Sequence, residues 1–213
     1  GKEELSARGT VEVESGEVRL STPYLTYKFK SGLLQAENLK LASGALEISA
    51  PRADYDPVAR KGSCQQGAVL SMTGLKFPLV VKGERLKFDL DSGQVEADGF
   101  MFENGSWSAL ASVGTLLLAR ANFEPVKIEL AGKAFFNLRQ KEDRSTFSYL
   151  DLRSDRIILT RQQADWTLLA PGGWEMKTQD NEKKLEGEGE KMKLTFEPEG
   201  QATSFLAQAA ILT

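Results

Sequence analysis

The chain has 213 residues, of which 41% are apolar, and a net charge of −3 at pH 7. This length suits one domain, and the apolar content is enough for a packed core, while the even mixture of 27 basic and 30 acidic residues argues against nucleic acid as a partner. Histidine is absent and Cys64 is the only cysteine, which excludes Ser-His-Asp and Cys-His catalysis, histidine zinc sites and an intrachain disulfide.

Apolar and charged residues alternate with period two along most of the chain. This pattern predicts antiparallel strands that bury one face and expose the other. The segments that show it are, in chain order, 10–14, 17–21, 26–30, 39–41, 46–48, 86–90, 126–130 and 192–196. Turn signals separate them, beginning with Ser15-Gly16, and Asn104-Gly105 is the strongest because both central residues of a type I′ hairpin need positive φ. The sequence therefore predicts an all-β chain.

Two segments fit a helix and a strand about equally well. Trp107 to Arg120 has several apolar residues on one helical side, but Gly114 interrupts it, and hairpin signals flank it. Ser204 to Leu212 has the same ambiguity. We expect strands in both segments. No Pro- or Ser-rich linker divides the sequence, so residues 1–213 are predicted to form a single domain.

A degenerate repeat underlies the alternation. Tyr27, Tyr55 and Phe88 occupy equivalent positions, separated by 28 and 33 residues. Each unit reads as a strand, a strand with a central aromatic residue, a turn at a glycine such as Gly62, and a strand that ends in Ala-x-Gly or a similar sequence. Units of this kind stack edge to edge and bury a continuous apolar face.

The run from Lys82 to Gly99, KGERLKFDLDSGQVEADG, resembles the repeat of the OstA-like family. This family comprises the lipopolysaccharide-transport proteins LptA and LptC and the periplasmic part of LptD. The shared pattern is an apolar strand, a Tyr/Phe-Asp step, a turn, and a strand that ends in Ala-x-Gly. The resemblance covers residues 8–165, and the segment from Gln162 to Gly173 fits it poorly.

The resemblance implies an elongated, twisted, partly open antiparallel β-jelly-roll in the periplasm. It implies a non-enzymatic role without cofactor or metal, in which the protein shields the lipid A acyl chains of lipopolysaccharide in a hydrophobic groove and passes them toward the outer membrane. In such proteins, terminal strands pair with other jelly-rolls of the family, and a homo-oligomer is compatible with this mode.

Strand parity indicates which side chains would line the groove. Gly99 is expected to mark a bulge that switches parity between Ala97 and Phe100. The same alternation would also build a closed sandwich filled by its own side chains, and only the resemblance favours the groove. Lys82, Arg85 and Lys87 would either meet lipid phosphates at the rim or solvate the outer face. The predicted groove residues are Tyr27, Phe29, Leu86, Phe88, Leu90, Phe100, Phe102, Ile128 and Leu130.

Other functions stay open on the sequence alone. The main alternative is a structural or adhesive β-solenoid that binds carbohydrate or another protein through a flat strand face. A glycan enzyme with two facing carboxylates is a further alternative, although no phosphate-loop or nucleophile motif is present.

The run Asp89-Leu90-Asp91-Ser92-Gly93 resembles the opening of a calcium loop but lacks its later ligands, so we expect an acidic turn there. Cys64 is expected to be structural.

Overall fold

The computed structural model describes residues 3–72, 79–139, 149–179, 184–197, 202–208 and 211–212. These residues form sixteen strands and no helix, which confirms the all-β prediction. None of the described residues belongs to a helix that is long and apolar enough to cross a membrane. The strands are β1 (Glu4–Ser15), β2 (Val18–Lys28), β3 (Leu33–Ser43), β4 (Leu46–Asp56), β5 (Lys61–Met72), β6 (Leu79–Asp89), β7 (Gln94–Asn104), β8 (Trp107–Leu118), β9 (Pro125–Arg139), β10 (Tyr149–Gln162), β11 (Asp165–Ala170), β12 (Trp174–Gln179), β13 (Lys184–Gly189), β14 (Lys191–Phe196), β15 (Ala202–Gln208) and β16 (Ile211–Leu212).

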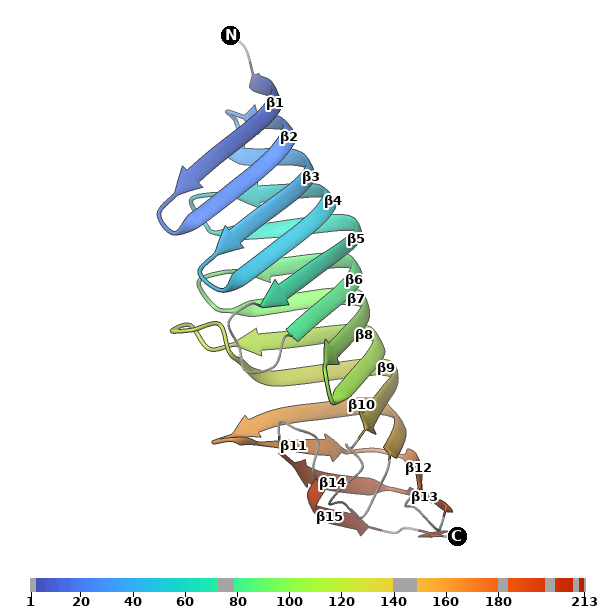
Figure 1. The fold of residues 1–213 in the computed structure, drawn as a ribbon. Helices are drawn as coiled ribbons and strands as arrows, with labels where there is room; N and C mark the ends of the chain where they lie inside the picture. Colours follow the sequence, from blue (N-terminus) through green and yellow to red (C-terminus); the bar gives the residue numbers. More distant parts are fainter. Residues whose placement is uncertain are drawn as a thin grey trace. The chain divides into compact units, whose positions relative to one another are not determined.

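The chain forms two compact units, residues 1–99 with 117–124 and residues 100–116 with 125–213. In the first unit, β1 to β6 lie in the sheet in chain order, each antiparallel to its neighbours (Figure 1). In the second unit, β9 and β10 also pair antiparallel, and the later strands extend the sheet from β10. That the whole sequence is one domain stays a prediction.

Several strands contain a bulge near their middle that separates two halves. In β7, burial moves from Val95 and Ala97 to Phe100 and Phe102 across Gly99, whose φ is +61°. In β5, the pairing with β6 shifts between Gln65 and Ala68, and the intervening residues have positive φ. A bulge bends a strand and can change which alternate side chains are buried. The alternation changes across the bulge of β7, whereas Cys64 and Ala68 on either side of the β5 bulge keep the same parity. The parity switch predicted at Gly99 is confirmed.

Two strands of the predicted repeat unit are one strand in the structure. The first strand of the unit, which begins at Leu46, and the strand with the central aromatic residue Tyr55 are the two halves of β4. Gly62 is predicted in a turn but lies inside β5. A glycine is needed there because the ring of Phe88 occupies the space of a side chain: a Cβ on Gly62 would lie 2.3 Å from Phe88 Cζ. Gly114 inside β8 has the same role, since a Cβ there would lie 2.2 Å from Phe100 Cγ.

The two ambiguous segments are strands, as expected. Trp107 to Leu118 forms β8, and Ser204 to Leu212 falls in β15 and β16, with residues 209 and 210 outside the described part. The hairpin predicted at Asn104-Gly105 joins β7 to β8, but only Gly105 has positive φ, at +48°. Asn104 stays extended as the last residue of β7, so the two-residue loop is Gly105-Ser106 and not the predicted type I′ turn.

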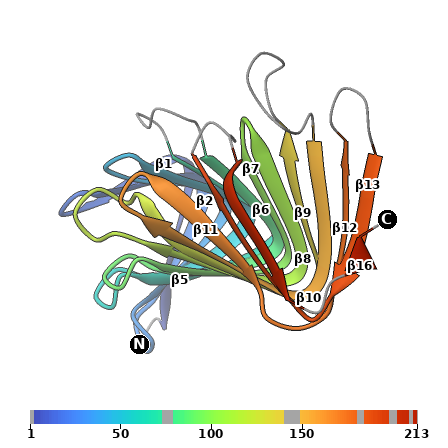
Figure 2. The ribbon, with the colours of Figure 1, turned by 90° about the horizontal axis from the view of Figure 1, so that it is seen from below.

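The sheet of the second unit divides after β10. Residues 149–154 of β10 pair with β12, and residues 158–162 pair with β11. One branch continues through β14 to β15, and the other through β13 to β16 (Figure 2). At the division, the Ser154 hydroxyl lies 3.0 and 2.9 Å from the carbonyl oxygens of Gly172 and Gly173, to which it donates. This division explains why residues 162–173 depart from the repeat.

Candidate functional site

The interior of the first unit is lined by straight cross-strand rows of apolar side chains. One row runs through paired positions from β1 to β6 and contains the three aromatic residues of the predicted repeat. The repeat therefore has a structural meaning, because it places Tyr27, Tyr55 and Phe88 in register on one face. The full row is Leu5, Tyr27, Leu34, Tyr55, Gly62 and Phe88. A neighbouring row is Ala7, Leu25, Ala36, Ala53, Cys64 and Leu86.

Exposure along this aromatic row rises toward the amino-terminal edge strand. Phe88 and Tyr55 are buried and their rings stack with centroids 6.1 Å apart across Gly62. Tyr27 is half-buried, and Leu5 on β1 is 60% exposed. The apolar interior of the first unit is thus covered in its middle and uncovered at β1. Burial also raises the pKa of Tyr55, whose hydroxyl has no hydrogen-bond partner in the described part of the chain.

The interior of the second unit is filled by an aromatic cluster, defined as Phe102, Trp107, Phe136, Trp166 and Phe196. Trp107 stacks on Phe102 at 4.4 Å between ring centroids and meets Trp166 at 5.4 Å and Phe196 at 5.7 Å. Strands β8 and β11 are not neighbours in the sheet, and neither are β8 and β14. The ring contacts therefore cross the interior and join two separate parts of the same sheet.

The predicted groove residues are buried, with two exceptions. Leu86, Phe88, Leu90, Phe100, Phe102, Ile128 and Leu130 are each at most 5% exposed. Tyr27 is half-buried in the aromatic row. Phe29 departs from expectation: β2 ends at Lys28, so Phe29 lies in the following turn, is 55% exposed, and packs edge-on against Tyr27. Whether any of these side chains contacts a ligand stays a prediction.

The sequence pattern predicts two members of the aromatic cluster only in part and misses two others. Phe196 lies in the predicted alternating segment 192–196 and Trp107 in an ambiguous segment, whereas Phe136 and Trp166 lie in no predicted strand. Each lies on the face of its strand whose side chains are buried, so the alternation of apolar and polar residues is enough to predict that it is buried. Their mutual contact depends on the division of the sheet after β10, which local alternation does not encode.

The basic residues considered for a phosphate-binding rim lie on the outer face. Lys82, Arg85 and Lys87 are exposed and alternate with buried Val81, Leu86 and Phe88. Arg85 is paired with Asp98 at 2.7 Å. These positions agree with solvating charges rather than with groups that face the interior.

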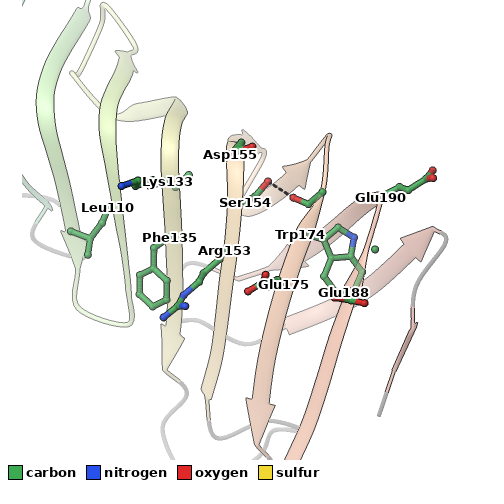
Figure 3. Close-up of a pocket in the computed structure, with 13 residues that line it drawn as sticks. Leu110, Lys133, Phe135, Arg153, Ser154, Asp155, Trp174, Glu175, Glu188 and Glu190 are labelled. Atoms are coloured by element: carbon green, nitrogen blue, oxygen red, sulfur yellow. Dashed lines mark hydrogen bonds between the residues drawn. The ribbon is translucent and has the colours of Figure 1, made fainter.

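An open pocket of about 1020 Å³ lies in the second unit (Figure 3). Phe135, Arg153, Glu175 and Glu188 occupy paired positions on β9, β10, β12 and β13, and Leu110 of β8 completes the lining on one side. The pocket carries charges of both signs, and none of the predicted groove residues lines it. Among the described residues, no group of three or more Asp, Glu or Cys side chains is arranged to hold a metal ion.

The acidic run at 89–93 is a turn held by its own backbone. The Asp89 carboxylate accepts the N–H groups of Ser92 at 3.1 Å and Asp91 at 3.0 Å, and Lys61 Nζ lies 3.1 Å from its other oxygen. These interactions, led by the backbone of Ser92, lower the pKa of Asp89 to about 2. This geometry is that of the expected acidic turn.

Replacing Asp89 with asparagine tests this interaction, because asparagine keeps the accepting oxygen and removes the charge. A lowered carboxyl pKa contributes stability above the unfolded value of about 4, and this contribution is lost as pH falls toward 2. We expect wild type to be more stable than D89N at pH 7 and the difference to shrink between pH 5 and pH 2. Urea unfolding followed by circular dichroism measures it; a difference that stays constant with pH would contradict the assignment.

Cys64 is a buried member of the second apolar row, 1% exposed. Burial raises the pKa of its thiol to about 12, so the thiolate is scarce at neutral pH. This environment is that of a structural cysteine.

Comparison with solved structures finds the crystal structure of LptH, the LptA homologous periplasmic component of the conserved lipopolysaccharide transport device from Pseudomonas aeruginosa. The chain is similar to it with a TM-score of 0.47 at 14% sequence identity, over 61% of this chain and 81% of the LptH chain. No protein-family model matches the sequence, and no curated protein matches it.

Proposed function

We propose that this chain is a periplasmic lipopolysaccharide-binding and transport protein. Its role is non-enzymatic: it shields acyl chains of lipid A in its apolar interior and passes them toward the outer membrane. The observation that carries the proposal is the aromatic row of the first unit, which is continuous from Phe88 to Tyr27 and becomes accessible at Leu5. The resemblance of residues 82–99 to the OstA-like repeat supports the same class of ligand.

Acyl chains are the ligand class that such an interior favours. Each methylene transferred from water to an apolar environment gains roughly 0.8 kcal/mol, and several chains on one ligand add their contributions. The row offers aromatic and aliphatic side chains and, at Tyr55, a hydroxyl without a partner in the described part of the chain. Access at the β1 end lets a chain enter beside Leu5 and Tyr27 without first separating the buried residues.

Site-specific photo-crosslinking tests the proposal with matched neighbours on opposite faces. A benzophenone amino acid replaces Leu5 or Phe88, whose positions belong to the aromatic row, and Ser6 or Lys87 serves as the control next to each. With lipopolysaccharide, we expect labelling from the row positions and at most background labelling from the controls. Labelling from Ser6 and Lys87 alone, or competition by lipid-free saccharide, would overturn the proposal and favour a carbohydrate-binding β-solenoid.

The partners that we propose are other jelly-roll proteins of the same kind, or a second copy, joined through edge strands. β1 pairs only with β2 and is exposed along most of its length, and β15 pairs only with β14 among the described strands. Unpaired strand edges present free N–H and C=O groups to another chain. Replacing exposed Leu5 with lysine should weaken concentration-dependent association in light scattering; unchanged association would exclude the β1 edge as the interface.

A further inference from the structure

Among the buried polar groups that have no hydrogen-bond partner in the described part of the chain, two lie close together in the sequence of the second unit. They are Oδ1 of Asn104, a residue that is 7% exposed, and Nε1 of Trp107, a residue that is 2% exposed. Native structures pair nearly all buried polar groups, and an unpaired one destabilises the fold. A pair of such groups at one place therefore calls for a functional explanation.

The two groups lie at neighbouring strand ends. Asn104 is the last residue of β7 and Trp107 the first of β8, and the loop between them has two residues. Both side chains are buried, so both point to the interior, where residues at the ends of a tight hairpin are cross-strand neighbours about 5 Å apart. The two residues thus occupy neighbouring positions at the end of one hairpin, one with an unpaired acceptor and the other with an unpaired donor.

Aromatic rings surround the Trp107 side chain. Trp107 is the centre of the aromatic cluster and contacts Phe102, Phe136, Trp166 and Phe196. Other unpartnered groups differ from this pair: Ser43 and Tyr55 in the first unit each present a single hydroxyl, and Trp174 presents a donor alone. Asn104 and Trp107 bring an unpaired acceptor and an unpaired donor to neighbouring positions next to the aromatic cluster.

We propose that Asn104 and Trp107 form a polar subsite for the amide that joins an acyl chain to its headgroup. A secondary amide matches both groups, since its carbonyl accepts from Trp107 Nε1–H and its N–H donates to Asn104 Oδ1. The attached chain packs against the aromatic cluster. This subsite rests on the proposed function and specifies which linkage the second unit recognises.

Two detergents that share a fourteen-carbon chain and a sulfobetaine headgroup test the subsite. One is myristoylamidopropyl dimethylammonio propanesulfonate, which contains a secondary amide, and the other is tetradecyl dimethylammonio propanesulfonate, which lacks it. Binding below the micelle concentration is measured by displacement of a fluorescent fatty acid from the full chain. Two matched hydrogen bonds predict that wild type prefers the amide probe by about tenfold.

Single substitutions distinguish the effect of the two hydrogen-bonding groups from the effect of altered packing. N104L removes the carboxamide, with its accepting oxygen, and W107F removes the indole N–H, while both keep a large apolar side chain, so we expect each to reduce the preference to within about twofold. S43A removes a buried, unpartnered hydroxyl in the first unit and is expected to keep the wild-type preference. N104L should also unfold at no lower denaturant concentration than wild type, because it removes an unsatisfied buried group.

The outcomes distinguish the subsite from the function on which it rests. Equal binding of both probes by wild type, or an unchanged preference in N104L and W107F, overturns the subsite and leaves acyl binding in place. Binding of neither probe overturns the subsite and the proposed acyl binding together. A preference that falls equally in S43A also overturns the subsite, because it would then reflect stability rather than local recognition.

Discussion

Replacing Trp107 with alanine is expected to lower the free energy of unfolding of the second unit by about 3–5 kcal/mol. Trp107 is 2% exposed and contacts four other aromatic rings, two of them on strands that are not its neighbours in the sheet. Its removal therefore leaves a cavity and also breaks the contacts that hold two parts of the sheet together. W107F keeps a ring in place and should lose less.

Tryptophan fluorescence in a urea titration measures this effect. All three tryptophans, Trp107, Trp166 and Trp174, belong to the second unit, so the two that remain in W107A still report its unfolding. Leu110→Ala is the matched control, because Leu110 lies on the same strand but is 38% exposed. A loss below about 1 kcal/mol in W107A, or one equal to that of L110A, would show that the cluster does not hold the second unit together.

Adding a single methyl group at Gly114 is expected to destabilise the second unit by about 1–3 kcal/mol. The Cβ of Gly114→Ala would lie 2.2 Å from Phe100 Cγ, and Phe100 is itself 1% exposed, so the ring has to move within a packed interior. The backbone of Gly114 does not require positive φ, so the effect comes from the contact alone.

A second substitution at Phe100 tests that explanation. We expect G114A/F100L to lose less stability than the sum of the two single variants, because the shorter side chain makes room for the new methyl group. Gly172→Ala is the matched control, since a Cβ there would meet nothing within 4 Å. Additive losses in the double-mutant cycle would mean that Gly114 is required for a reason other than its approach to Phe100.

The part of the fold that alternation encodes was predictable. The alternation of apolar and charged residues correctly predicts which side chains are buried along nearly every strand. The repeat predicts that Tyr27, Tyr55 and Phe88 are equivalent, and the strand registers place them in one cross-strand row. Gly99 was identified because parity changes across it. These features depend only on residues near one another in sequence, since each strand of the first unit pairs with the strands before and after it.

Features that depend on distant contacts escaped prediction. Gly62 and Gly114 resembled turn or break signals, yet each lies in a strand beneath an aromatic ring that belongs to another strand. Strand β10 pairs with β11 and β12 along different halves, so the meeting of Trp107 with Trp166 and Phe196 follows from a change of partner along one strand. Alternation gives the face on which a side chain lies, but not which strands that face will meet.

The order of pairing in the first unit has a mechanical consequence. From β1 to β6, each strand is joined to the next by an antiparallel ladder and a short connection, so the ladders are arranged in series. Force applied at the amino terminus would load the β1–β2 ladder alone before it reached the next one. The first unit would then open from β1 one strand at a time, and it would lengthen under load while the strands farther from the pull stay paired.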